Sequence, residues 1–170
     1  VFKQIKELSA SAMPVEIPIG EGADFSGIIN LFSERAHMFT KGTTTGEYTE
    51  GDIPDSLKDK EAQWETELQE ALATTNESLL ETYLEGGHIS REEAIDAMAL
   101  SMSRGEVVPV FCGSGTLTYG VRALLRKLVE LCPSPAEARR EFVGDTQLVA
   151  DDDGPLAALV FKTAAEPHVG

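Results

Sequence analysis

An apolar run in this sequence breaks abruptly into a loop of small residues. The stretch VVPVFCGSG, residues 107–115, joins a strand pattern to Cys-Gly-Ser-Gly, and a helix pattern follows from Val121. In α/β folds such a loop can hold a ligand, because small residues let the backbone approach it closely. Ser114 and Gly115 are therefore candidate binding residues. The same arrangement also occurs as a plain strand-to-helix connection, and the loop alone does not separate these two interpretations.

Residues that bind metals or form disulfides are sparse. The three histidines, His37, His88 and His168, are scattered, and no C-x-x-C or H-E-x-x-H spacing occurs, so we expect no metal site. The two cysteines, Cys112 and Cys132, are far apart and stand among apolar residues. This usage is typical of buried, reduced thiols in a cytoplasmic protein.

The chain is strongly acidic. Its 170 residues include 14 Lys and Arg against 29 Asp and Glu, a formal net charge of −15. Such a surface repels phosphate backbones, so we expect no direct nucleic-acid binding. A basic protein partner fits the charge better, and a merely solubilising role is the alternative. No apolar run is long enough to cross a bilayer and no signal-peptide pattern opens the chain, which predicts a cytoplasmic location without membrane contact.

Short strands are predicted in the first third of the chain. One covers residues 13–20, and residues 27–40 read as two strands or a hairpin broken at Ser33-Glu34. Residues 41–54 have the Gly, Thr and Asp content of a loop or an edge strand.

Helices are predicted in the middle of the chain and after the loop. Asp55 can cap a long helix, and a second one stops at Gly86-Gly87. A third begins with a Ser90–Glu93 capping box and ends at Gly105. The last has an apolar stripe at i, i+3, i+4, i+7 and i+8, formed by Val121, Leu124, Leu125, Leu128 and Val129.

The order of these elements predicts an α/β fold with an insertion. Residues 1–20 and 107–133 are expected to be neighbours in one parallel sheet, and residues 21–106 leave that sheet and return to it. The chain opens in what looks like the second half of an amphipathic helix and closes in PLAALVFKTAAEPHVG, a strand pattern without a partner. We therefore expect the sequence to be an internal segment of a longer protein.

Five stretches, in this order, resemble the translational GTPases of the elongation factor G family. They are PVEIPIG with FSGIINLF, YLEGG, VVPVFCGSG, GVRALL with LCPSP, and GPLAALVFKTAAEPHVG. The resemblance covers essentially the whole chain. It implies that residues 1–20 end the first part of a P-loop-type GTPase domain and that residues 21–106 form an inserted α+β subdomain. Residues 107–135 would be the last strand, guanine loop and helix of the GTPase domain, and 136–170 a linker and the first strand of a β-barrel domain.

The same resemblance implies a nucleotide and a reaction. The intact protein would use GTP, with magnesium, to act on the ribosome in translocation or recycling. Ser114 and Gly115 would lie in the guanine-recognition loop, where a backbone N–H donates to guanine O6; Gly115 replaces the family's usual Ala. Because the sequence contains neither G-x-x-x-x-G-K-[ST] nor N-K-x-D, this chain by itself is expected to hold no cofactor and to be no GTPase.

The family's insert also implies a partner. Its acidic helical face is implicated in contacting the ribosomal stalk protein, and Glu67, Glu70 and Glu77 can form such a face here. Trp64 would be buried between the long helix and the strands of residues 27–40. Two other functions stay open: a ribosomal protection protein or class three release factor, and a stand-alone acidic protein-binding module.

Overall fold

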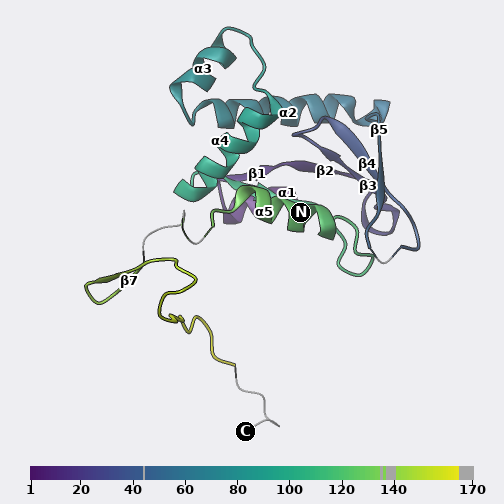
Figure 1. Cartoon of the computed structure of the whole chain (residues 1–170). Coiled ribbons are helices and arrows are strands. Elements are labelled where there is room, and N and C mark those ends of the chain that lie inside the picture. The colour runs from purple at the N-terminus through teal and green to yellow at the C-terminus, as the bar shows by residue number, and fades with distance from the viewer. Residues whose placement is uncertain (44, 135, 137–140, 165–170) are drawn as a thin grey trace. The chain divides into compact units, whose positions relative to one another are not determined.

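The computed structural model describes residues 1–43, 45–134, 136 and 141–164 (Figure 1). The chain divides into two compact units, Val1–Cys132 and Pro133–Gly170. The fold is mixed α/β, with one parallel and two antiparallel sheets among the described residues. The helices are α1 (Phe2–Leu8), α2 (Lys58–Ala73), α3 (Glu77–Leu84), α4 (Arg91–Arg104) and α5 (Val121–Leu131). The strands are β1 (Ala12–Pro14), β2 (Glu16–Ile19), β3 (Gly27–Asn30), β4 (Arg35–Phe39), β5 (Tyr48–Gly51), β6 (Val108–Val110), β7 (Glu141–Val143) and β8 (Thr146–Leu148).

Two strands far apart in the sequence form the parallel sheet. β1 pairs with β6 in parallel, with Ala12 opposite Val108 and Pro14 opposite Val110. The backbone N–H of Val15 extends the pairing by donating to the Val110 carbonyl at 3.1 Å. The prediction that the two pieces flanking the insertion are neighbours in one parallel sheet is confirmed. β6 is shorter and more exposed than the buried strand expected from residues 107–112.

The inserted region builds a four-stranded antiparallel sheet in the order β2-β3-β4-β5. β3 and β4 form the predicted hairpin, and β5 is its edge strand. The single strand expected over residues 13–20 is instead two strands, because the chain leaves β1 at Val15 and enters the antiparallel sheet at Glu16. The antiparallel sheet thus begins before residue 21, where the insertion was expected to start.

The helices of the insertion follow the local signals closely. Ser90 and Glu93 form the predicted capping box of α4, and Gly105 ends that helix in the left-handed conformation (φ 72°). Asp55 does not cap α2. It begins a single 3₁₀ turn, Asp55–Leu57, and its carboxylate pairs with the Lys58 Nζ at 2.6 Å.

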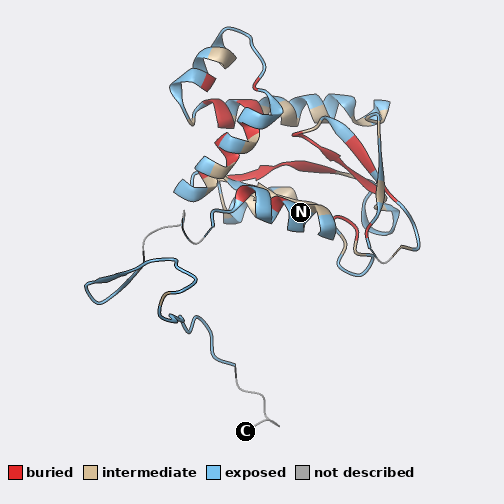
Figure 2. Ribbon diagram, viewed as in Figure 1, coloured by how far each residue is buried: buried red, intermediate tan, exposed pale blue. Residues whose placement is uncertain are grey.

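The antiparallel sheet contributes apolar side chains to two separate buried clusters. Figure 2 shows that much of its ribbon is buried. Ile17 and Ile29 face the main core, together with Leu72 of α2 and Met98 of α4. The second, smaller cluster contains Ile28, Phe39 and Tyr119, so it joins the insertion to the loop after β6. This alternation follows from the two-residue period of a strand.

Trp64 lies at the edge of the main core. It is half-buried rather than fully packed, and its ring meets Phe2 of α1 edge-on, with ring centroids 5.0 Å apart. The expected burial of Trp64 under the strands of residues 27–40 is therefore only partly met. The contact links α2 of the insertion to the helix that precedes β1.

The apolar stripe of α5 does not face the core of this unit. Val121, Leu125, Leu128 and Val129 are all exposed, and Leu128 is 47% exposed. The buried residues of α5 are Leu131 and Lys127. The Lys127 ammonium pairs with Glu130 at 2.7 Å and lies 4.8 Å from the centre of the Phe32 ring. The sequence pattern predicted the helix correctly, but it did not predict which side of α5 packs against the core of this unit.

The second unit contains a hairpin of β7 and β8 in the stretch expected to be a polar linker. The strand expected in PLAALVFKTAAEPHVG does not form over residues 155–164, which are exposed and belong to no helix or strand. Residues 165–170 of that stretch lie outside the described part of the chain. Among the described residues, no helix has the length and apolar content needed to span a membrane.

Candidate binding cleft at the end of the parallel strands

A cleft of about 650 Å³ opens at the carboxyl ends of the two parallel strands, β1 and β6. Apolar side chains make most of its wall, and a few polar groups, Glu16, Glu21, Lys60 and Ser114, are set among them. Its lining includes Phe2, Ile5, Ile17, Phe25, Trp64, Phe111, Cys112 and Gly113. Ligands of α/β proteins bind at this edge of a sheet, and a largely apolar cleft of this size can take a small molecule.

The loop after β6 forms one wall of the cleft and is held by hydrogen bonds within itself. The backbone N–H of Ser114 donates to the Tyr119 carbonyl at 2.9 Å, which closes the loop as an isolated antiparallel bridge. The Ser114 hydroxyl lies 3.3 Å from the Thr116 hydroxyl. The Ser114 amide is therefore already engaged within the loop and is not free to donate to a ligand.

The glycines of the loop differ in whether the fold has room for a side chain at their positions. Gly120 has φ +78°, and a Cβ there would lie 2.5 Å from the Cys112 carbonyl oxygen. A Cβ at Gly113 would lie 2.9 Å from the Tyr119 carbonyl oxygen. Gly115 is exposed, and a Cβ there would meet nothing within 4 Å. The loop fold therefore needs Gly113 and Gly120, while Gly115 leaves open space beside its backbone.

Tyr119 anchors the loop to the insertion. Its ring stacks on Phe39 of β4 with centroids 4.8 Å apart and an angle of 13° between the planes. Phe25 also packs here, with its ring centroid 6.4 Å from that of Tyr119. The turn between β4 and β5 also approaches the loop, because a Cβ at Gly46 would lie 2.4 Å from the Thr118 carbonyl oxygen. The conformation of the loop thus depends on the antiparallel sheet, a contact that the sequence pattern did not reveal.

Glu16 is a buried acid at the floor of this region. It is 3% exposed, its Oε2 accepts the backbone N–H of Cys112 at 3.0 Å, and its Oε1 is buried without a hydrogen-bond partner among the described residues. Burial raises the pKa of Glu16 to about 7, against smaller lowering effects from the Cys112 N–H and the Lys127 charge. Sequence reasoning missed this residue; its only signal was an acid between Val15 and Ile17 in an apolar strand.

The two cysteines differ from what was expected. Cys112 is partly buried, and its thiol donates to the Glu16 carbonyl oxygen at 3.5 Å. Burial, followed by the nearby Glu16 charge, raises the pKa of Cys112 to about 11, so the thiol stays protonated and is a poor nucleophile. Cys132 is exposed rather than buried. Both are free thiols.

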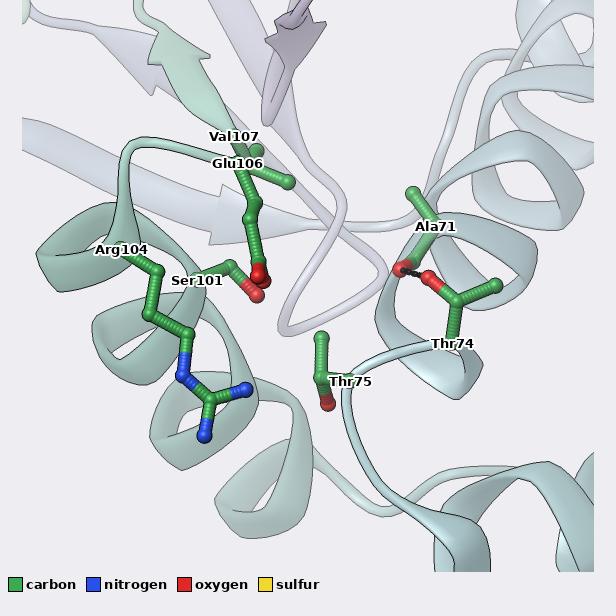
Figure 3. Close-up of a pocket in the computed structure, with 7 residues that line it drawn as sticks. All are labelled: Ala71, Thr74, Thr75, Ser101, Arg104, Glu106 and Val107. Carbon is green, nitrogen blue, oxygen red and sulfur yellow. Dashed lines mark hydrogen bonds between the residues drawn. The ribbon is translucent and has the colours of Figure 1, made fainter.

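A second, smaller cavity of about 370 Å³ lies between the C-terminal ends of α2 and α4 (Figure 3). Its hydroxyl groups already donate within their own helices: Thr74 to Ala71 at 2.8 Å, Thr75 to Leu72 at 2.7 Å, and Ser101 to Ala97 at 2.8 Å. The other polar side chains of its lining are Arg104 and Glu106, and its volume is little more than half that of the cleft. The cleft beside the parallel strands is the better candidate site.

The three predicted acidic residues lie on two helices. Glu67 and Glu70 are on α2, and Glu77 is in the first turn of α3. The Glu67 carboxylate accepts the Gln63 side-chain amide at 3.2 Å, and the Glu70 carboxylate accepts the Tyr83 hydroxyl at 3.0 Å. Glu70 and Glu77 are exposed, and Glu67 is half-exposed. The Tyr83 contact ties α3 to α2 beside this acidic surface.

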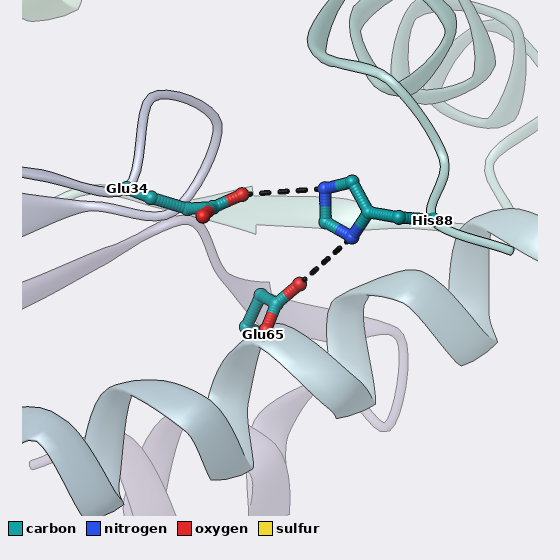
Figure 4. Close-up of side chains that lie close together, drawn as sticks. All are labelled: Glu34, Glu65 and His88. Carbon is teal, nitrogen blue, oxygen red and sulfur yellow. Dashed lines mark ion pairs between the residues drawn. The ribbon is translucent and has the colours of Figure 1, made fainter. Parts of the chain in front are cut away.

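His88 is brought next to two glutamates that are distant in sequence (Figure 4). Its Nε2 lies 3.3 Å from Glu34 and its Nδ1 3.3 Å from Glu65. The sequence was interpreted as having no metal site, because motif spacing cannot report residues that only the fold brings together. The two other histidines do not join this group: His37 is buried in β4, and His168 lies outside the described residues.

The comparisons with known proteins support the mixed α/β fold and indicate no particular function. No protein-family model matches the chain. The chain is similar to a protein of Thermus thermophilus known from its crystal structure, with 30% sequence identity and a TM-score of 0.69. The similarity covers 80% of this chain and 20% of the Thermus chain. This chain therefore spans about a fifth of the length of that protein.

Proposed function

We propose that this chain is a segment of a cytoplasmic translational GTPase of the elongation factor G type, which acts on the ribosome through GTP hydrolysis. One observation carries the proposal: β1 and β6 pair in parallel across a long insertion, and the loop of residues 112–120 follows at their carboxyl end. Sequence motifs resembling that family occupy both sides of the insertion in the same order. The exposed apolar stripe of α5 also supports it, because further elements of a GTPase domain would cover that stripe.

In this proposal the loop after β6 recognises guanine. Guanine presents an acceptor, O6, where adenine presents an amino donor, so a backbone N–H distinguishes the two bases. The Ser114 amide is bound to Tyr119, so we assign the donor to the next residue, Gly115, which is exposed and has open space beside its backbone. With adenine, this backbone donor would face the amino group, a second donor, and stay unpaired. That costs about 1–3 kcal/mol, which gives roughly a ten- to hundredfold preference for guanine over adenine.

The phosphates, magnesium and the attacking water would be held by residues that this sequence does not contain, since it has no G-x-x-x-x-G-K-[ST] and no N-K-x-D. A single base contact without a phosphate site gives negligible affinity. We therefore expect calorimetry with GTP or GDP to detect no binding to this chain and expect no hydrolysis. Micromolar GDP binding by the chain alone would contradict the proposal that the phosphate site lies outside this sequence.

Two experiments test the proposal itself. The coding sequence directly upstream of Val1 should encode a P-loop and N-K-x-D, and their absence would overturn it. In the longer protein, Gly115→Pro removes the amide hydrogen while Gly115→Ala keeps it. We expect the Pro variant, but not the Ala variant, to lose preference for GDP over ADP. Equal preference in both variants would show that Gly115 does not read the base.

The acidic surface of α2 and α3 supports a proposed partner, the ribosomal stalk protein. Attraction between Glu67, Glu70 and Glu77 and a basic partner acts mainly on the association rate and weakens with salt. Glu67→Lys with Glu70→Lys should slow stalk-dependent stimulation of the longer protein. Its stability should fall only slightly, because the contacts that these changes remove, with Gln63 and Tyr83, lie at the surface. Unchanged stimulation at low salt would show that this surface is only solvated.

A further inference from the structure

We propose that Glu34, Glu65 and His88 form a binding site for a divalent first-row transition cation such as Zn²⁺. One carboxylate oxygen from each glutamate and one imidazole nitrogen lie within 4.8 Å of one another. Imidazole with carboxylate suits zinc, iron or nickel, whereas magnesium and calcium take oxygen ligands alone. Three protein ligands leave a fourth position for water.

The three ligands come from three separate elements. Glu34 stands in the turn between β3 and β4, Glu65 near the middle of α2, and His88 in the loop before α4 (Figure 4). An ion held by all three would fasten the antiparallel sheet to the helical layer. The site is separate from the cleft and does not depend on the proposed nucleotide chemistry.

The nitrogen–oxygen distances are close to those at a metal, but the side chains must rearrange to share one ion. Two donors on a tetrahedral zinc ion, at bonds of about 2.0–2.1 Å, are about 3.4 Å apart. The two closest nitrogen–oxygen distances are 3.3 Å each. The two glutamates face different ring nitrogens, so one of them must rotate to share an ion with the other. The Glu34 side chain is 51% exposed and has room to do so.

Buried amide side chains fix the backbone at two of the ligands. Asn30 Oδ1 accepts the N–H groups of Phe32 and Ser33, both at 3.1 Å, directly before Glu34. Gln69 binds both backbone groups of Ile89, accepting its N–H at 2.9 Å and donating to its carbonyl at 3.3 Å, directly after His88. Asn30 and Gln69 are both buried. The ligand-bearing loops are thus held in place before an ion arrives, which lowers the entropic cost of binding.

The local charge also favours a cation. Glu61 is one helical turn from Glu65, and burial, then the charges of Glu65 and Glu34, raise the pKa of Glu61. A third carboxylate, that of Glu61, therefore lies close enough to Glu65 and Glu34 to feel their charges. A divalent cation bound by Glu34 and Glu65 would relieve the repulsion among these carboxylates.

The test is a zinc titration of the untagged chain by calorimetry, with cobalt absorption as a second readout. We expect one ion per chain, a rise in the unfolding temperature with zinc, and a visible cobalt band of a four-coordinate site. His88→Gln and Glu65→Gln should each weaken zinc binding by about tenfold or more, since even outer-sphere partners are worth that much. Glu67→Gln, the same change on the same helix, and His168→Gln should keep the affinity.

Two results would overturn the site. One is equal zinc affinity in His88→Gln and the unchanged chain, which would place any bound zinc elsewhere. The other is a chain that zinc neither binds nor stabilises at millimolar concentration, while His88→Gln lowers its stability. That combination would make the cluster a plain ion pair of His88 with two glutamates.

Discussion

At the scale of single residues, Glu16 has the largest expected influence on how stability depends on pH. Its pKa is 4.5 in the unfolded chain and about 7 when folded. The folded state therefore binds the proton more tightly, and the resulting stabilisation is complete below pH 4.5 and is lost as the pH rises through 7. A shift of this size corresponds to at most about 3 kcal/mol.

We therefore expect Glu16→Gln to stabilise the chain at and above pH 7, by up to about 3 kcal/mol. The amide cannot ionise, yet its oxygen can still accept the Cys112 N–H. Urea unfolding at several pH values measures the difference between the two chains. The lowered pKa of buried His37 acts in the opposite direction, but it is present in both and cancels. Glu21→Gln, an exposed change at the same cleft, is the control, and an equal effect there would contradict the assignment.

The loop glycines give a second prediction at this scale. Gly115→Ala should stabilise the chain by about 0.4–1 kcal/mol, because the position is open and the change restricts only the unfolded state. Gly120→Ala should destabilise it by more than about 1 kcal/mol, because φ is +78° and the new Cβ meets the Cys112 carbonyl. Paired denaturant unfolding curves measure both. A loss of stability at Gly115 would mean that its backbone is more constrained than the structure shows.

At the scale of elements, the contact between Phe2 and Trp64 fastens α1 to α2. Because Trp64 is only half-buried, Trp64→Ala should cost less than the ~3–5 kcal/mol of a fully buried aromatic residue. In a double-mutant cycle with Phe2→Ala, the coupling energy should be about 0.5–1.5 kcal/mol, the usual value for an edge-to-face pair. A coupling near zero would show that the two helices do not depend on this contact.

Elements whose signals are local were predictable from the sequence. The Ser90–Glu93 capping box, the Gly105 helix end and the hairpin of residues 27–40 each rest on neighbours a few residues apart, and all three are confirmed. The parallel pairing of β1 with β6 was predictable from the order of elements. The stripe of α5 shows the limit, because periodicity identifies an apolar face but does not say what covers it.

The candidate sites were less predictable for the same reason. The loop of Ser114 and Gly115 was found as a local break in an apolar run. The roles of Glu16, Tyr119 and His88 depend on partners 96, 80 and 54 positions away, which are Cys112, Phe39 and Glu34 respectively. No spacing rule within one element reports such pairs.

At the scale of the whole molecule, the exposed apolar stripe of α5 bears on whether the chain self-associates. Contiguous apolar residues on a surface favour association, so we expect this chain to self-associate at high concentration. Leu125→Gln with Leu128→Gln should shift sedimentation towards the monomer and change stability by less than about 0.5 kcal/mol. Leu131→Gln, at a position 2% exposed, should instead destabilise the fold. Sedimentation unchanged by the double substitution would place any association on another face.

The pairing of β1 with β6 also bears on the order in which the chain folds. It joins Pro14 to Val110 across the entire insertion. Closing a flexible loop of that length costs about 4 kcal/mol in chain entropy, and a pair of three-residue strands returns little. If the antiparallel sheet and α2–α4 form first, the two ends are already near each other and most of that cost disappears. The insertion is thus expected to fold early and to act as the template on which the parallel strands, and the loop they carry, are assembled last.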